Sequence, residues 1–118
     1  MINVSFSRDD ETISLRVNGH AGQADMGQDI VCASASILAY TVAQTLVYID
    51  AQGGLKERPH LNLKSGYAEI NCKPTDEYAG EVLQTFFVAE VGYTLLAHNY
   101  PQYVELKMFG ETNQNKGE

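Results

Sequence analysis

LNLKSGYAEINCKP, at residues 61–74, has the alternating pattern of a β-hairpin. Apolar residues alternate with polar ones on both sides of Ser65-Gly66, and such a dipeptide between alternating segments is typical of a tight hairpin turn. The alternating apolar residues are Leu61, Leu63, Ala68, Ile70 and Cys72. Pro74 then ends the second strand, because proline cannot donate a hydrogen bond to a strand ladder. The stretch therefore predicts an antiparallel hairpin with one buried face, and it places Cys72 in the core.

Residues 75–99 have the pattern of a long helix. Thr75 is a suitable N-cap residue, and Pro101 follows the last apolar position and cannot continue a helix. Between them, apolar residues recur on one stripe: Ala79, Val82, Leu83, Phe86, Phe87 and Leu95. Residues 103–109 alternate again and predict a last strand.

The first half of the chain has the same order of hairpin and helix. Residues 2–7 and 13–17 alternate apolar and polar residues, and the polar segment between them favours a turn. Asp29 is a candidate N-cap for a helix whose apolar residues recur up to Gly53-Gly54. The complete order is ββαββαβ, which predicts an α+β sandwich with two long helices packed on an antiparallel or mixed sheet.

Length and composition indicate one folded domain. The chain has 118 residues, 44% of them hydrophobic and 19% charged, and we expect a single domain over residues 1–110 with a flexible tail over residues 111–118. The formal net charge is −7, and the eight Lys and Arg residues form no basic stripe. The sequence therefore argues against direct nucleic-acid binding. An acidic surface instead favours a cationic protein or peptide as the partner.

The N-terminal residues favour a cytoplasmic protein. They have no basic-then-apolar signal pattern, and we expect no run of the length of a membrane span and no membrane contact. Thiols stay reduced in the cytoplasm, so Cys32 and Cys72 are expected to be inert, catalytic or metal-bound rather than joined in a disulfide. The cysteines and histidines lack the close paired spacings of a zinc site. We therefore expect neither a metal nor a cofactor.

GHAGQADMGQDIVCASAS, residues 19–36, contains the candidate catalytic residues. With Asp29 as the N-cap, Cys32 lies in the first helical turn, where unpaired N–H groups and the positive end of the helix dipole favour a thiolate. The same N–H groups can hold the oxyanion of a tetrahedral intermediate. His20 lies outside the apolar alternation of the preceding strand, so it is available as a general base. These residue types support a Cys/His catalytic site and a plain loop beside a buried cysteine about equally.

Neighbouring residues bear on this site in different ways. A carboxylate at Asp29 disfavours a neighbouring thiolate unless it binds backbone N–H groups or completes a triad with the histidine. Ser36 suits either a hydrogen bond within the site or a packing role. Gly22 and Gly27 suit a loop that opens for substrate and closes over it.

The segments GHA at residues 19–21 and GQDIVCA at residues 27–33, followed by Ser36, resemble the signature of the ribosomal-processing cysteine protease Prp family. The resemblance implies a homodimeric thiol protease, a hydrolase that acts in ribosome biogenesis in the cytoplasm. It implies that Cys32 is the nucleophile and that His20 is the general base. The supporting residues that it implies are Asp29, Ser36, Gly19 and Gly27.

The resemblance also implies a substrate. In this family the protease removes a short N-terminal extension from the large-subunit ribosomal protein L-twenty-seven, cutting after a pair of phenylalanines in an apolar motif. A basic ribosomal protein precursor is therefore the expected substrate. Two alternatives stay open, namely the same chemistry on bacteriophage structural proteins with a similar leader, and a non-catalytic ribosome-associated binding module that docks through the GHA loop. Residues 98–118 have no recognised family feature.

Overall fold

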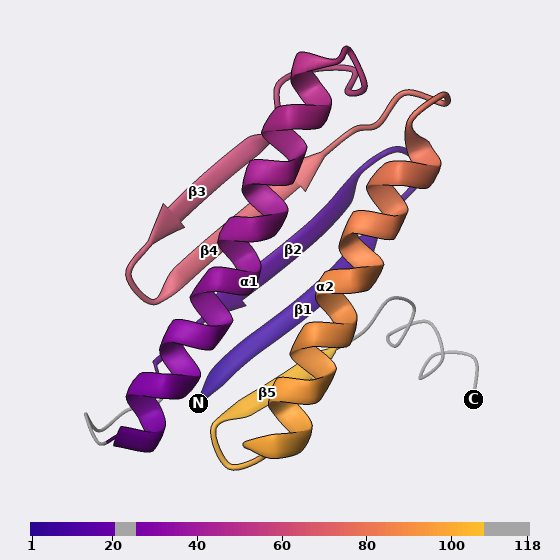
Figure 1. The fold of residues 1–118 in the computed structure, drawn as a ribbon. Helices are drawn as coiled ribbons and strands as arrows, with labels where there is room; N and C mark the ends of the chain where they lie inside the picture. Colours follow the sequence, from indigo (N-terminus) through magenta and orange to yellow (C-terminus); the bar gives the residue numbers. More distant parts are fainter. Residues whose placement is uncertain (21–25, 108–118) are drawn as a thin grey trace, which may run out of the picture.

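The structure is a computed structural model that describes residues 1–20 and 26–107, and in residues 26–29 it describes the backbone alone. Two helices, α1 (Met26–Ala51) and α2 (Ala79–Asn99), run antiparallel on one face of a five-stranded sheet (Figure 1). The strands are β1 (Ile2–Arg8), β2 (Ile13–Asn18), β3 (His60–Lys64), β4 (Tyr67–Cys72) and β5 (Val104–Lys107). The predicted ββαββαβ order and α+β architecture are confirmed.

The sheet is mixed, with the strand order β3-β4-β2-β1-β5. The pairs β1 with β2, β2 with β4 and β3 with β4 are antiparallel, whereas β5 pairs parallel with β1. The predicted turn at Ser65-Gly66 joins β3 to β4, with Lys64 opposite Tyr67, and Gly66 has a φ of +75°. Glycine takes this conformation without steric cost, so the turn sets the register of the hairpin.

The core lies between the sheet and the helix layer. Leu15 of β2 lies opposite Phe6 of β1 and Ile70 of β4, and all three side chains are buried. Phe6 also meets Phe86 and Tyr93 of α2 edge to face, with ring centroids 6.4 and 6.0 Å away. Aromatic pairs prefer this geometry. Three neighbouring strands and α2 therefore share one apolar layer.

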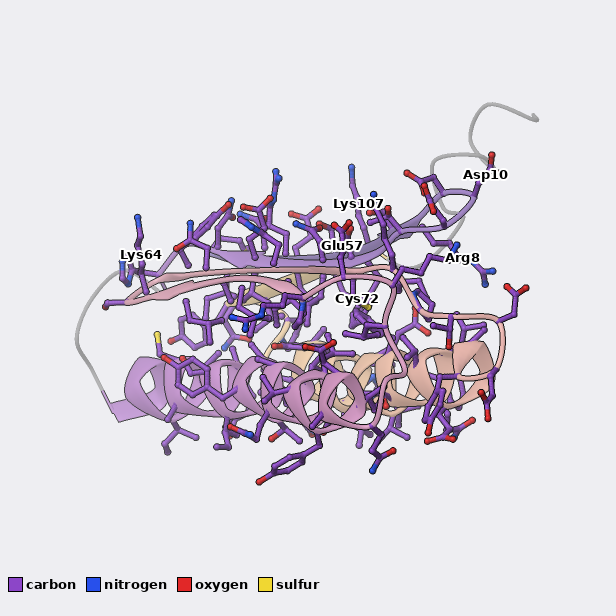
Figure 2. All side chains as sticks on the ribbon, turned by 90° about the horizontal axis from the view of Figure 1, so that it is seen from above. Arg8, Asp10, Glu57, Lys64, Cys72 and Lys107 are labelled. Atoms are coloured by element: carbon purple, nitrogen blue, oxygen red, sulfur yellow. The ribbon has the colours of Figure 1, made fainter. Side chains whose placement is uncertain are left out.

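Cys72 and Tyr93 are among the buried side chains of this layer. Cys72, at the end of β4, lies between the sheet and the helices (Figure 2) and is 3% exposed, which confirms its predicted core position. Tyr93 of α2 donates a hydrogen bond from its hydroxyl to the Ala35 carbonyl oxygen of α1 at 2.8 Å. Burial raises the pKa of Tyr93 above its usual value, so the hydroxyl keeps its proton and stays a donor. The bond joins α2 to the first half of α1.

The start of α2 differs from the prediction. The helix begins at Ala79, and Thr75 is not its N-cap. The Thr75 hydroxyl instead accepts a hydrogen bond from the Tyr78 backbone N–H at 3.3 Å and closes the turn that precedes the helix. A Thr side chain can stabilise such a turn in the same way as it caps a helix, so the local pattern does not distinguish the two.

The start of α1 also differs from the prediction, because the helix begins earlier than Asp29. The helix begins at Met26, so Asp29 lies inside it and is not the N-cap. Gly27 favours a loop at that point, but a glycine costs a helix only about 1 kcal/mol, and the helix continues through it. The four unpaired N–H groups of the helix start therefore precede Cys32, which lies in the second turn. The other end is as predicted: Gly53 has a φ of +79°, and the N–H of Gly54 bonds to the Ile49 carbonyl oxygen at 2.9 Å.

The outward faces of the two layers differ in charge. The outer face of the sheet carries charged side chains, including Lys107 (Figure 2) and the ion pair between Arg16 and Glu69. By contrast, α1 has no charged residue over residues 30–49, and over residues 82–97 α2 has one, the buried Glu90. The helix layer therefore presents an uncharged surface on its outer side.

Contrary to the expectation that no run has the length of a membrane span, Ile30–Ala51 has 22 residues and a mean hydropathy of 1.7, enough for a span by length and composition. The reason is that α1 is apolar on both faces. Its inner face is part of the core, with Val31, Ala35, Ala39, Val42, Ala43, Leu46 and Ile49 buried. A core helix of this kind passes the same test as a membrane span.

Candidate active site

His20 follows the end of β2, where three segments of the chain meet. The N–H of Gly19 donates to the Gly66 carbonyl oxygen at 3.0 Å, and the backbone nitrogen of Met1 donates to the His20 carbonyl oxygen at 2.7 Å. Gly19 has a φ of +106°, and a Cβ there would overlap the Met1 carbonyl oxygen, so the position requires glycine. These contacts hold the backbone that presents the exposed His20 side chain.

Cys32 lies opposite this corner on α1. Its thiol is free and half-buried, and it packs against the edge of the core. Because the position is in the second turn of the helix, the positive end of the helix dipole acts on it less strongly than on a first-turn residue. The expected oxyanion donors from the N–H groups around Cys32 are likewise engaged within the helix.

Cys32 and His20 line one cavity of about 360 Å³. One wall comes from α1, and the other comes from the end of β2 and the turn between β3 and β4. Small apolar residues and two aromatic rings also line it: Ala33, Ala35, Ala39, Ala68, Tyr40 and Tyr67. The cavity therefore places a thiol and an imidazole beside an apolar space.

Four of the predicted site residues meet at this cavity, namely Gly19, His20, Cys32 and Ser36. Gly27 and Asp29 lie in the first turn of α1, where the side chain of Asp29 is outside the described residues, so a triad stays untested. The hinge at Gly22 and the tail at residues 111–118 are also outside the described residues.

Sequence reasoning missed Gly66, Tyr67 and Tyr40 as cavity residues. The first two reach the site because β4 pairs with β2, with Tyr67 opposite Asn18, and no local pattern indicates which strands of two hairpins will pair. Tyr40 had a usable signal. It follows Cys32 and Ser36 at a further helical turn, a spacing that places all three on one face of α1.

Cys72 gives a built-in comparison for the reactivity of Cys32. Burial raises the pKa of the Cys72 thiol to about 12, so at pH 8 it is a neutral thiol shielded from solvent. We expect iodoacetamide at pH 8 to alkylate Cys32 in the folded protein and to leave Cys72 unmodified until the protein is denatured. Peptide mass spectrometry measures both sites in one sample, and equal rates at the two cysteines would contradict the structure.

Metal-ligating side chains do not cluster in the part of the chain that the structure describes. No three His, Cys, Asp or Glu residues there lie close enough together to hold a metal ion. The described side chains that line the cavity include a thiol and an imidazole, the two groups that a Cys/His catalytic site uses.

Comparison with known proteins decides the family. The family model described as Cysteine protease Prp matches residues 1–105, almost the whole described chain. The chain belongs to the cysteine protease Prp family. It is accordingly a peptide hydrolase of the cysteine-protease class, and the alternative of a non-catalytic binding module loses its support. No match is found among curated proteins.

Solved structures of Prp proteins and their relatives have the same fold. The ribosomal processing protease Prp of S. aureus in complex with a substrate peptide is 22% identical, with a TM-score of 0.69 over 92% of this chain and 99% of that chain. SMU.848 from Streptococcus mutans is 26% identical, with a TM-score of 0.68 over 92% and 94%. The S. aureus protease with a covalently linked product peptide is 22% identical, with a TM-score of 0.66 over 92% and 99%.

Proposed function

We propose that this protein is a ribosomal processing protease in which Cys32 is the nucleophile and His20 the general base. The observation that supports the proposal most strongly is that these two side chains line one cavity in a chain of the cysteine protease Prp family. Among the residues that line the cavity, His20, Ser36 and Tyr40 are exposed, so the cavity is open to solvent and accessible to a peptide.

The proposed mechanism is acyl transfer. His20 takes the proton of the Cys32 thiol, and the thiolate attacks the carbonyl carbon of the scissile peptide bond. The tetrahedral intermediate collapses when His20 returns the proton to the leaving amine, which leaves a thioester on Cys32. His20 then deprotonates a water molecule that attacks the thioester, and the acid product leaves as the thiol is restored.

Supporting roles follow from position. Because Gly19 has no side chain, its backbone can lie against the Met1 carbonyl group, and this contact positions the backbone of the neighbouring His20. Ser36 is exposed, lies one turn after Cys32 and lines the same cavity, and we assign to its hydroxyl a hydrogen bond to bound substrate. We assign to Gly27 a role in the backbone conformation at the start of α1. Asp29 is the candidate third member of a triad with Cys32 and His20.

The substrate we propose is a basic ribosomal protein precursor, namely L-twenty-seven with its short N-terminal extension, cut after a pair of phenylalanines in the cytoplasm. The solved S. aureus Prp structures contain a substrate peptide and a covalently linked product peptide, which supports a peptide substrate for this chain. Small alanines and two tyrosine rings around the cavity suit an aromatic side chain. A net charge of −7 favours the approach of a basic protein.

The test is mass spectrometry of this precursor after incubation with the protein. We expect a single cut after the second phenylalanine and no cut when both phenylalanines are replaced by alanine. A His20→Ala variant is expected to lose the cut. An intact precursor in the presence of folded enzyme would contradict this substrate. Cleavage of a phage structural protein with a similar leader, in place of the ribosomal precursor, would support the alternative target with the same chemistry.

We further propose that a second copy of the chain covers the outer face of the helix layer. Large apolar side chains there are between 53% and 62% exposed: Ile37, Tyr48, Phe87, Val88 and Leu95. Large apolar side chains exposed together on one face are a feature of interaction surfaces in soluble proteins. The exposed residues of this face carry no charge over residues 30–49 and 82–97, so two copies can approach there although each has a net charge of −7.

Charge placed on this face is expected to separate the dimer. Val88→Glu and Leu95→Glu each bury a carboxylate against an apolar partner, which is unfavourable without a counter-charge. We expect sedimentation analysis to give a wild-type mass of twice the 13.0 kDa chain and a single-chain mass for both variants. Ser7→Glu is the control, because it adds the same charge at an exposed residue of β1 on the other layer; this variant should stay dimeric. A monomeric wild type would contradict the proposed interface.

A further inference from the structure

We infer that Gly66, in the turn between β3 and β4, is a positioning residue for the His20 imidazole. The inference rests on the proposed function, because it assigns a role to Gly66 only through His20 as general base. It extends the site to a hairpin that lies more than forty positions away from His20 along the chain.

The sheet brings this turn to the site. β2 and β4 pair up to Asn18 opposite Tyr67, so the residues that follow β2 lie beside the residues that precede β4. The N–H of Gly19 then donates to the Gly66 carbonyl oxygen at 3.0 Å, one bond beyond the last pair of the ladder. The turn and the backbone of the general base are therefore held together by a direct hydrogen bond.

The His20 ring rests on Gly66 itself. A Cβ built at Gly66 would overlap Nε2 and Cε1 of His20, and it would lie 3.1 Å from Cδ2. The tip of the imidazole thus occupies the space that any other residue would fill with its side chain. Because the overlapping atoms Nε2 and Cε1 are at the far end of an exposed side chain, the ring can rotate away, and it would then leave the orientation that it has beside the cavity.

Two properties of Gly66 need to be separated. Its φ of +75° disfavours other residues for backbone reasons, and the imidazole disfavours them for reasons of space. Gly53 offers a matched control, since it has a φ of +79° and no atom within 4 Å of a Cβ built there. Asn tolerates a positive φ better than Ala does. Gly66→Asn therefore reduces the backbone penalty at this φ and keeps the overlap between the new Cβ and the His20 ring.

The experiment compares Gly66→Ala, Gly66→Asn and Gly53→Ala by two measurements. The first is kcat/KM for precursor cleavage. The second is the rate of Cys32 alkylation by iodoacetamide from about pH 5 to about pH 9, the range in which histidine and cysteine side chains commonly titrate. Each variant is also made in a His20→Ala background. We expect both Gly66 variants to lose about 100-fold in kcat/KM, the size of effect that a misplaced group of about 1 Å produces. Their alkylation profiles should match that of His20→Ala, whereas Gly53→Ala should match the wild type. In the His20→Ala background, Gly66→Ala should change the alkylation rate less than about twofold, since coupled residues are not additive.

Different outcomes separate this inference from the proposed function. Wild-type cleavage by Gly66→Asn, or an equal loss of alkylation from Gly66→Ala with and without His20, would overturn the positioning role and leave the Cys/His chemistry intact. Wild-type cleavage by His20→Ala would overturn the proposed function and the inference with it. Thermal unfolding controls for folding, because Gly66→Ala and Gly53→Ala share the same backbone penalty and should lower Tm similarly.

Discussion

Replacement of Cys32 with alanine is expected to abolish precursor cleavage and to lower kcat by a factor on the order of 10⁵ to 10⁶, the loss that follows deletion of a catalytic nucleophile. In the proposed mechanism the Cys32 sulfur forms the thioester, and neither the imidazole of His20 nor the Ser36 hydroxyl lies at the same position to replace it. The half-buried thiol contacts only the edge of the core, so the variant should fold like the wild type. Mass spectrometry of the precursor, with single-turnover amounts of enzyme, measures the residual rate.

Cys72→Ala is the matched control for this loss. It also replaces a thiol with a methyl group, but at a side chain that is 3% exposed and does not line the cavity. We expect cleavage at the wild-type rate with a small loss of stability. Residual cleavage by Cys32→Ala at more than about one hundredth of the wild-type rate, well above the range given for a deleted nucleophile, would exclude Cys32 as the nucleophile.

Leu15→Ala is expected to lower the free energy of unfolding by about 2 to 5 kcal/mol, the range for truncating a fully buried leucine. Leu15 lies on β2, between Phe6 of β1 and Ile70 of β4, and is completely buried. Its removal leaves a cavity that strands on both sides line and that the sheet cannot close. Since small domains are stable by only about 5 to 15 kcal/mol, the variant should be near the limit of folding. Urea denaturation followed by circular dichroism gives the difference.

Arg16→Ala, at the adjacent residue on the opposite face of β2, is the control. Arg16 is exposed and pairs with Glu69 at 3.3 Å, and exposed ion pairs contribute about 0 to 1 kcal/mol. A loss for Arg16→Ala equal to that for Leu15→Ala would contradict the two-sided sheet, with its core on one face.

Alternating and helical patterns were enough to predict the elements of this fold. Both hairpins, the turn at Ser65-Gly66 and the end of α1 at Gly53 are as expected, since each depends on residues close together in sequence. The helix starts were wrong. Thr75 and Asp29 are good cap residues, but caps also stabilise turns, and the choice depends on how the first turn packs. The parallel pairing of β5 with β1 was left open, because it joins opposite parts of the chain.

The candidate site divides in the same way. The residue types made His20, Cys32 and Ser36 candidates, the resemblance to the family signature implied their roles, and the fold brings all three to one cavity. The turn at Gly66 was predicted, but its position beside His20 could not be, because that position depends on which strand pairs with β2. Its contact with the imidazole exists only after β4 has paired with β2. Residues that shape a site through pairing across a sheet leave no trace in local sequence.

The pairing of β1 with β5 also constrains how the chain folds during its synthesis. Ile2 lies opposite Val104, so the partner of the first strand is translated about a hundred residues later. At about 5 to 20 residues per second, β1 waits on the order of 5 to 20 s with one edge open. Open strand edges recruit other chains, and contacts so distant in sequence slow folding. Until β5 emerges and completes the sheet, the early β1–β2 hairpin of a nascent copy has an unpaired edge that is open to contact with other chains.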